Sequence, residues 1–395
     1  MRVIEGSAFV AAPSGGMTLA QLGAEVIRFD NIGGGIDYKR WPLTEAGESL
    51  YWTGLNKNKR SIAVNLREPQ AQELLTELIA DAGNFLTNFP ARGWMSWETL
   101  QSRRADLNMV AITGNRDGTT AIDYTVNAAI GFPFVTGPVD AQGPVNNVLA
   151  AWDLICGQTA ALAMLAADRH RLRAGVGSNM SIALFDVALA ATAALGHIAE
   201  AEVLGTERQR FGNDLYGAYG TTFTTSDDVW IYAAGISPRQ WRSLLEATDA
   251  AEAVEAIESQ LGLDFADEGD RFGAREDVTT AIQRWVGAHT ITEVGARFDE
   301  LGVCWGRYQS FLELVNTDPR CSLHSELFRA VHQPDVGTYI TPGSPIALGG
   351  LIPVEPAPAP RLGADTEPLL AELGLTAAEI GDLVDRGIVL VATPR

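Results

Sequence analysis

Cysteine and histidine are scarce in this chain of 395 residues. The three cysteines, Cys156, Cys304 and Cys321, lie far apart and form no CxxC pair, and the five histidines show no HExxH motif. These absences exclude a disulfide framework and a zinc-finger signature, and they give no paired spacing for a metalloenzyme centre. We therefore predict a protein that has no metal site.

Positive charge is also in short supply. The chain has 29 lysines and arginines against 49 aspartates and glutamates, so its formal net charge is −20. Binding to nucleic acid or to an anionic membrane surface requires a broad positive field. The composition therefore excludes both as partners, and an anionic ligand would have to be held by a local basic pocket.

Long uninterrupted apolar runs are missing as well. The most apolar stretch, 149–167, contains Asp153 and Gln158. An aspartate at the centre of a bilayer costs roughly 2.5–3.5 kcal/mol, so this stretch predicts a buried core helix and not a membrane span. The opening residues, MRVIEGSAFVAAP, do not have the pattern of a secretory signal. We expect a cytoplasmic protein.

The first half of the chain alternates between strand and helix patterns. Short apolar runs at 24–30, 83–89 and 107–114 suit buried strands, whereas 68–83 has apolar residues at helical spacing. A longer helix is expected over 151–173, where glycines follow. Strands that alternate with helices predict an α/β fold with a parallel sheet.

A second, smaller domain is predicted from residue 205 onward. Single cores stop growing near roughly 250–300 residues, so the chain is long enough for two. Residues 216–235 are typical of a hairpin that turns at 226–228, and helical patterns follow at 238–260 and 278–302. Further on, 354–363 is a proline-rich connector, and two helical patterns close the chain.

Basic side chains gather in one segment of this acidic chain. The 29 residues from 39 to 67 contain six of them and only two acids; the six are Lys39, Arg40, Lys57, Lys59, Arg60 and Arg67. Just upstream, Gly33, Gly34 and Gly35 would let a backbone approach a phosphate closely. A solvated basic turn with flexible glycines is the alternative, because charge runs are usually solvated. The composition of the segment leaves both open.

Asp153 is the second residue that requires an explanation. It stands in the most apolar helix of the chain, where a free carboxylate is costly unless it is paired or functional. Its place near the helix N-terminus offers the ordinary alternative, a helix acid that is stabilised by the macrodipole.

Several stretches in one order resemble the class III CoA-transferases, the CaiB/BaiF family, over nearly the whole chain. Asp153, followed by Gly157 and by RAGVG at 173–177, has the spacing that surrounds the catalytic aspartate of that family. The other supporting stretches are LGAEVIRFD, NKNKRSIAVNL, LTNFPARG, GNDLYGAYGTTFTTSDD, LGVCWGRYQ and APRLGADTEPLLAELG. Residues 3–43 are similar to the branch that moves CoA between the two carboxyl groups of mesaconate, the isomerisation of 2-methylfumaryl-CoA.

The resemblance implies an architecture and a substrate class. A Rossmann-like large domain would be built from 1–204 and 323–395, with a small α+β domain at 205–322 and an interlocked homodimer. The substrate would be the CoA thioester of a small dicarboxylic acid, with no permanently bound cofactor. The basic segment 57–67 would then hold the phosphorylated end of CoA.

The resemblance also assigns site residues. Asp153 would be the covalent nucleophile. Contacts with CoA would fall on Arg40, Val64, Asn65, Leu66, Arg67, Asn88, Phe89, Arg92, Ile122 and Asp123.

Two departures from the family narrow the chemistry. Relatives that racemise acyl-CoA thioesters need a base on each face of the α-carbon, and the positions of those bases are Ile122 and Ser237 here. Formyl- and oxalyl-type transferases carry a glycine-rich loop over the site, of which only RFGND at 210–214 is present. Racemisation is therefore disfavoured. Intramolecular CoA transfer, intermolecular transfer to a separate acid and a non-catalytic acyl-CoA-binding protein stay open, and Asp153 favours the two enzymes.

Overall fold

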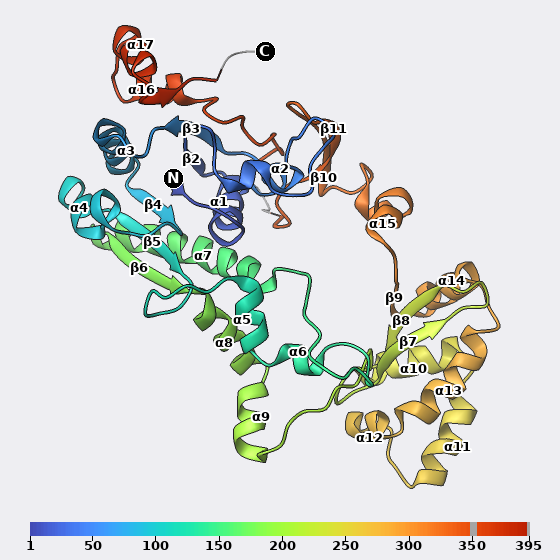
Figure 1. Cartoon of the computed structure of the whole chain (residues 1–395). Helices are drawn as coiled ribbons and strands as arrows, with labels where there is room; N and C mark the ends of the chain where they lie inside the picture. Colours follow the sequence, from blue (N-terminus) through green and yellow to red (C-terminus); the bar gives the residue numbers. More distant parts are fainter. Residues whose placement is uncertain (348–353, 393–395) are drawn as a thin grey trace. The chain divides into compact units, whose positions relative to one another are not determined.

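The computed structural model describes residues 1–347 and 354–392, and the chain forms two compact units (Figure 1). The first unit comprises Met1–Ile130, Asn147–Leu204 and Pro319–Arg395, and the second comprises Gly131–Asn146 and Gly205–Asp318. Residues 131–146 thus cluster with the second unit, although the sequence analysis counts them with the large domain. The domain boundaries at 205 and 322 stay a prediction.

The first unit is organised around a seven-stranded sheet in the order β12-β3-β2-β1-β4-β5-β6. All neighbouring pairs are parallel except β12 with β3. The strands are β1 (Arg2–Gly6), β2 (Glu25–Asn31), β3 (Arg60–Val64), β4 (Asn84–Thr87), β5 (Asn108–Thr113), β6 (Ser178–Ala183) and β12 (Val389–Leu390). The predicted α/β class with a mostly parallel sheet is therefore confirmed.

The strand order determines where a ligand site is expected. The order 3-2-1-4-5-6 is that of doubly wound dinucleotide-binding sheets, which bind ligands outside the carboxyl ends of the strands at the point where the order reverses. Here the reversal falls between β1 and β4. The loops that leave these two strands are therefore the first place to look for a functional site.

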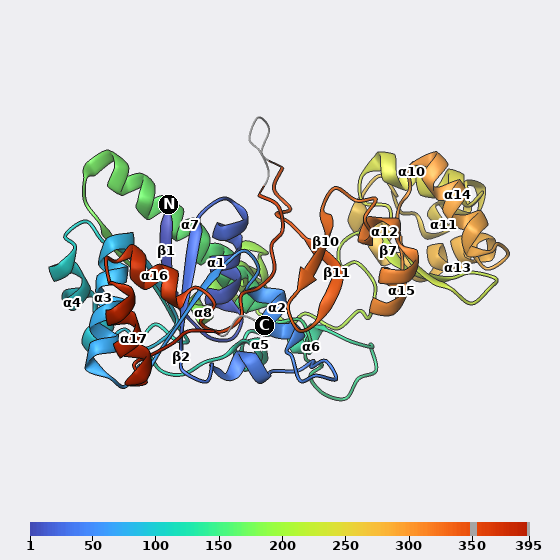
Figure 2. The same ribbon diagram turned by 90° about the horizontal axis from the view of Figure 1, so that it is seen from above.

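Helices cover both faces of this sheet. Successive side chains of a strand point to opposite faces, so the buried apolar residues of the strands need a cover on each side. Ile4 and Phe85 pack into an apolar core with helix α3 (Pro69–Ala82) and the C-terminal helices α16 (Thr366–Glu372) and α17 (Ala377–Asp385). The C-terminal segment, red in Figure 2, accordingly returns to the side of α3.

The opposite face carries helices α1 (Ala11–Gln21) and α7 (Ala151–Ala174). They approach closely at Gly15 and Gly157, where an added Cβ on Gly157 would lie 2.0 Å from Oγ of Ser14. The remaining helical segments of this unit are η1 (Ile36–Lys39), α2 (Leu50–Leu55), η2 (Gly93–Met95), α4 (Trp97–Arg103), α5 (Asp123–Ala129), α8 (Leu184–Ala194), α9 (His197–Leu204) and η3 (Pro319–Cys321).

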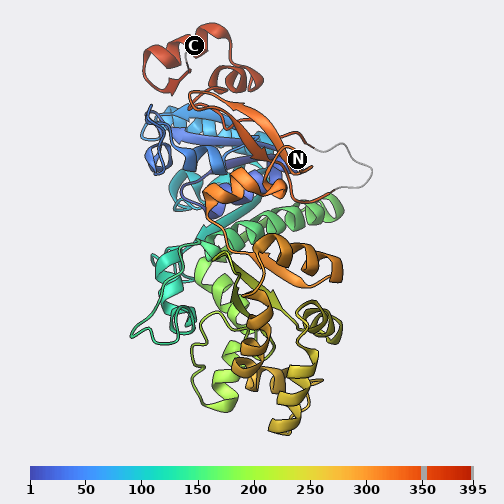
Figure 3. The ribbon, with the colours of Figure 1, turned by 90° about the vertical axis from the view of Figure 1, so that its right-hand side faces the viewer.

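Helix α7 differs from the buried core helix that its composition predicts. It is the long green helix of Figure 3, and only one side of it is buried. Leu162 and Leu172, on other sides, are 68% and 80% exposed. Within the described residues no single helix has the length and apolar composition to cross a membrane; α8 and α9 meet those criteria only as a pair bent by 65°.

The second unit contains a three-stranded antiparallel sheet in the order β7-β8-β9. The predicted hairpin is confirmed as β7 (Gly220–Thr224) and β8 (Trp230–Ala234), and its turn places Asp228 at φ +60°. The other elements are α6 (Phe132–Val135), α10 (Pro238–Ala247), α11 (Ala251–Leu261), α12 (Glu268–Gly273), α13 (Arg275–Val286), α14 (Ile291–Leu301), β9 (Cys304–Arg307) and α15 (Phe311–Thr317).

Two helical stretches that the sequence presents as continuous are interrupted in this unit. The stretch 238–260 divides into α10 and α11 because Asp249 between them adopts φ +49°, which ends a right-handed helix. The stretch 278–302 divides where Gly287 follows α13 and Thr290 caps α14. Back in the first unit, a hairpin of β10 (Phe328–Gln333) and β11 (Gly337–Pro342) precedes the connector.

Candidate active site

The loops that leave β1 and β4 are joined by one side chain. Asn88 follows β4, and its Oδ1 accepts the N–H of Ala8 at 2.9 Å while its Nδ2 donates to the carbonyl of Ala8 at 2.7 Å. Both ends of the amide are therefore used on the chain that follows β1. Asn88, predicted from the resemblance to contact CoA, holds this loop with its side chain.

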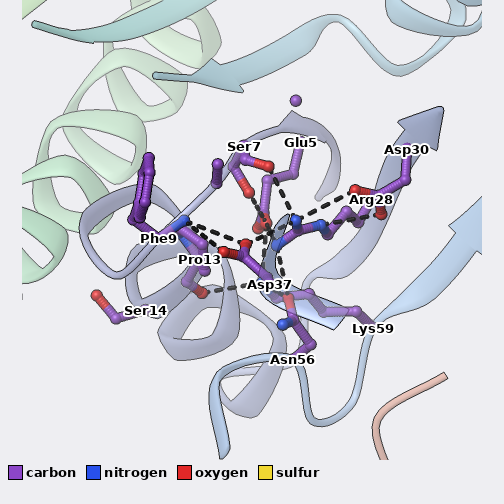
Figure 4. Close-up of polar contacts among 12 residues, drawn as sticks. Glu5, Ser7, Phe9, Pro13, Ser14, Arg28, Asp30, Asp37, Asn56 and Lys59 are labelled. Carbon is purple, nitrogen blue, oxygen red and sulfur yellow. Dashed lines mark hydrogen bonds and ion pairs between the residues drawn. The ribbon is translucent and has the colours of Figure 1, made fainter. Parts of the chain in front are cut away.

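A buried ionic cluster supports the same loop (Figure 4). Arg28 of β2 donates to both carboxylate oxygens of Asp30, at 3.1 and 3.2 Å, and to Oδ2 of Asp37 at 3.1 Å. Asp37 in turn accepts the backbone N–H of Phe9 with both oxygens, each at 3.1 Å. Phe9 has φ +66°, a left-handed conformation that is costly for a side chain of this size. The cluster therefore holds the loop after β1 in a conformation that its sequence does not favour.

Two lysines of the basic segment 57–67 are buried and bind other parts of the chain. Nζ of Lys59 is buried and donates to Glu5, to the carbonyl of Pro13 and to Asn56, each at 2.9 Å. Lys57 is 7% exposed and donates to the carbonyl of Gly54 at 3.0 Å.

Arg60, the third base of this segment, lies within 3.4 Å of three carboxylates, those of Glu25, Asp365 and Glu372. The prediction that this segment holds phosphates is therefore wrong for Lys59, whose charge is paired inside the fold. Arg60 pairs with partly exposed carboxylates, and for it the prediction stays a prediction.

The glycines before η1 form a turn that requires their backbone conformation. Gly33 and Gly34 have φ values of +92° and +80°, which only glycine adopts without strain. The N–H of Gly34 closes the turn on the carbonyl of Asn31 at 2.8 Å. The conformation alone explains these two glycines.

Asp153 lies in the first turn of α7, and its carboxylate is partly buried. Its pKa is raised to about 6, chiefly by burial and also by the negative charge of Asp123, whereas Arg40 acts in the opposite direction. Among the described residues no side chain or backbone group donates a hydrogen bond to this carboxylate. A partly buried carboxylate without a donor has the properties of a nucleophile.

Asp123, which the resemblance assigns to CoA, has a different partner. It begins α5, its side chain is buried, and its Oδ2 accepts the backbone N–H of Asp153 at 3.0 Å. Trp152 makes a second link between the same helices, because its Nε1 donates to Oδ1 of Asn127 at 3.1 Å. Helix α5 therefore fixes the start of α7.

Arg40 and Tyr51 complete the surroundings of Asp153. The guanidinium of Arg40 lies over the ring of Tyr51 at 4.8 Å and over that of Phe9 at 5.4 Å, and no carboxylate in the described part of the chain forms an ion pair with it. The hydroxyl of Tyr51 is buried without a hydrogen-bond partner among the described residues. Burial raises the pKa of Tyr51, and Asp153 is one of the charges that act on it. The sequence analysis missed Tyr51, since a tyrosine in a short apolar helix carries no signal of its own.

Of the other predicted CoA contacts, Val64 ends strand β3, and the rest lie in the segments that follow strands. Val64 has no exposed surface and belongs to the core, so its side chain is not available to a ligand. Oδ1 of Asn65 accepts the backbone N–H of Arg67, and the Arg67 residue itself is exposed. Leu66 and Phe89 pack against the same core, and Arg92 and Ile122 are exposed.

The two racemase positions have structural roles here. Ile122 is the residue before α5, and Ser237 caps α10 by accepting the N–H of Gln240. Neither offers a base. Within the described residues no three His, Cys, Asp or Glu side chains are grouped so that they could hold a metal ion.

The chain belongs to CoA-transferase family III, whose sequence model matches residues 1–366. Its doubly wound sheet and the partly buried aspartate at the start of α7 stand within that match. The chain is 51% identical to the 2-methylfumaryl-CoA isomerase of Chloroflexus aurantiacus, over 98% of this chain and 97% of that protein. It is 27% identical to a succinyl-CoA–D-citramalate CoA-transferase of the same organism, over 98% and 97%.

A solved structure shares the fold. The CaiB/BaiF family protein from Brucella suis matches with a TM-score of 0.77 at 23% identity, over 94% of this chain and 98% of that one. This similarity agrees with the observed fold.

Proposed function

We propose that this protein is an intramolecular CoA transferase that moves CoA between the two carboxyl groups of mesaconate, the isomerisation of 2-methylfumaryl-CoA. The observation that carries the chemistry is the Asp153 carboxylate, partly buried, without a hydrogen-bond donor in the described chain and with its pKa raised to about 6. The substrate is inferred from the full-length relative that is 51% identical.

The first half of the reaction forms an enzyme thioester. The ionised carboxylate of Asp153 attacks the thioester carbonyl, the C–S bond breaks, and a mixed anhydride and CoA thiolate result. The thiolate then attacks the aspartyl carbonyl of that anhydride and releases mesaconate as a free dicarboxylate. Asp153 now carries CoA as a thioester.

The second half reverses these steps from the other end of the acid. Mesaconate turns within the site, and its second carboxylate attacks the aspartyl thioester and expels the thiolate. The thiolate attacks the acyl carbonyl of the new anhydride, which gives the isomeric thioester and restores the carboxylate of Asp153. Atoms and charge balance without a cofactor, so no permanently bound cofactor is part of the proposal.

Retention of the acid explains why an added acceptor is unnecessary. A carboxylate that is held next to the enzyme thioester acts at an effective concentration on the order of 10⁵ M or more. Free acids at millimolar concentrations could not compete with it.

The test is turnover of mesaconyl-CoA by the purified protein in the presence of isotope-labelled mesaconate. We expect conversion between the two regioisomers without any added acceptor, and label should enter the product only slowly. If label appears as fast as isomerisation, the acid leaves and rebinds, and intermolecular transfer becomes the better description. If the thioester is bound but not converted, the protein is an acyl-CoA-binding protein.

The homodimer belongs to the same proposal. Leu162 and Leu172 on α7 expose most of their apolar surface, and helix α9 has no buried residue, with Val203 and Leu204 exposed. Large exposed apolar patches are typical of protein–protein contacts, and these side chains are the candidates for one. Light scattering should give twice the mass of the 42.3 kDa chain. A cytoplasmic location, where free CoA thioesters are made, completes the proposal.

A further inference from the structure

Helix α7 begins without a cap of its own. The residue before it, Ala150, has no side-chain oxygen and makes no side-chain cap hydrogen bond. The first N–H groups of a helix have no partner inside it and require an acceptor. Asp123 supplies it from another helix, since its carboxylate accepts the N–H of Asp153 at 3.0 Å and also a hydrogen bond from the N–H of Trp152. The two helices are therefore joined at the residue that carries the proposed chemistry.

This arrangement changes what Asp153 can do. A carboxylate in the first turn of a helix is ordinarily stabilised by the free N–H groups there. Because Asp123 occupies those groups, the side chain of Asp153 is left without a donor in the described structure. A carboxylate that is free of hydrogen bonds keeps its electron pairs available for attack.

We propose that Asp123 is a positioning residue for the nucleophile: it fixes the start of α7 and keeps the helix N–H groups away from the carboxylate of Asp153. The inference rests on the proposed role of Asp153 in CoA transfer. It replaces the direct contact with CoA that the resemblance implies for Asp123. The tie between Trp152 and Asn127 supports it independently, because it fastens the same two helix starts to each other.

The charges around Asp153 determine how its pKa should respond when Asp123 is replaced. Asp123 of α5 and Arg40 after η1 act electrostatically on Asp153, and Asp153 in turn acts on Tyr51 of α2 and on Cys156 of α7 itself. Asp123 raises the pKa of Asp153 and Arg40 lowers it, whereas the phenol and the thiol are neutral near pH 6, since burial raises the pKa of both. Removal of the Asp123 charge therefore moves the ionisation of Asp153 to lower pH.

Two substitutions separate the charge of Asp123 from its hydrogen bond. Asp123→Asn keeps an oxygen that accepts the N–H of Asp153 but removes the charge, so the acid limb of kcat/KM against pH should shift to lower pH with a small loss of kcat at pH 8. Asp123→Ala also removes the acceptor. Because misplacement of a reacting group by about 1 Å costs on the order of 10²-fold in rate, kcat should fall by roughly 10- to 100-fold with little change in KM.

The control is Asp117→Asn, which removes a charge from the exposed loop before α5, where Asp117 bonds only to Thr119. It should leave kcat and the acid limb unchanged. Thermal unfolding of each variant shows whether it is folded, and the position of the acid limb reports on Asp153 whatever the stability.

Three outcomes overturn the inference. If the acid limb stays in place in Asp123→Asn, the charge of Asp123 does not act on Asp153. If kcat is unchanged in Asp123→Ala, the hydrogen bonds of Asp123 do not position Asp153. A rise in KM without loss of kcat would return Asp123 to a direct contact with CoA. Asp153→Ala separates the two proposals: if it is inactive while the Asp123 variants behave as the parent, this inference alone fails, and if Asp153→Ala is active, the proposed function fails first.

Discussion

Nζ of Lys59 lies 2.9 Å from Oε1 of Glu5, and neither side chain has any exposed surface. Lys59 is the residue before β3, and Glu5 lies in β1. Both belong to the buried cluster that holds the loop after β1. Burial lowers the pKa of Lys59 to about 8, and the glutamate acts against that shift. The pair therefore supports the loop after β1 from inside the fold, and neither side chain can contact a ligand.

Loss of this lysine should destabilise the protein. Lys59→Met leaves the buried Glu5 with a hydrogen bond from the Ser7 hydroxyl at 2.6 Å and with Arg28, at 3.8 Å, as its nearest cation. Breaking a buried ion pair costs about 3–5 kcal/mol of unfolding free energy. Denaturant unfolding measures the loss. Arg103→Ala is the control, since it breaks exposed pairs with Glu73 and Glu77 and should cost about 1 kcal/mol or less. A loss in Lys59→Met as small as that of the control would contradict the prediction.

Asp153→Ala should abolish CoA transfer while the fold stays intact, and Asp153→Asn should lose most of it, because the covalent intermediates form on this carboxylate. Treatment of the working enzyme with hydroxylamine in the presence of substrate should modify Asp153, since amines trap activated carboxyl groups; mass spectrometry of peptides from α7 detects the adduct. Asp168→Asn, on the same helix but paired with Arg171, should remain active. Substantial transfer by Asp153→Ala would refute the covalent mechanism.

The same carboxylate should make the protein less stable as the pH rises. The folded-state pKa of Asp153 is about 6 against an ordinary 3.8, so between these values the folded state binds more protons and stability falls with increasing pH. Asp153→Asn lacks this penalty. Its advantage in unfolding free energy over the parent should grow from pH 5 to pH 7 and level off above it at about 1–2 kcal/mol. A constant difference across this range would show that the pKa is not raised.

Arg40→Ala should weaken substrate binding by roughly 1.5–3 kcal/mol, the range for hydrogen bonds to charged groups. If Arg40 binds the phosphates of CoA, the loss should be much smaller for a pantetheine thioester that lacks the nucleotide, and calorimetry of both ligands measures the difference. Equal losses would place Arg40 at the acyl end, next to Asp153. Arg116→Ala, an exposed arginine paired with Asp186, is the matched control.

Much of the fold could be predicted from the sequence, because its signals are local. The apolar runs at 24–30, 83–89 and 107–114 became β2, β4 and β5, and Gly175 ended α7 in a left-handed conformation as expected. The continuous helix predicted at 238–260 failed for a reason that periodicity does not contain: Asp249 takes a positive φ. Local composition sets the type of an element more firmly than its continuity.

The sequence by itself placed Asp153 in the first turn of a helix and kept it in an apolar segment, since both follow from residues within one or two turns of it. Only the tertiary structure decided that Lys59 pairs with Glu5, 54 residues away, and that Asp123 accepts the N–H of Asp153 from 30 residues away. The sequence specifies which side chains are charged, but the partner of each charge depends on which strands and helices the fold brings together. Lys57 and Lys59 of a basic segment thus became buried, and Asp123, a predicted ligand contact, became an acceptor for the first turn of α7.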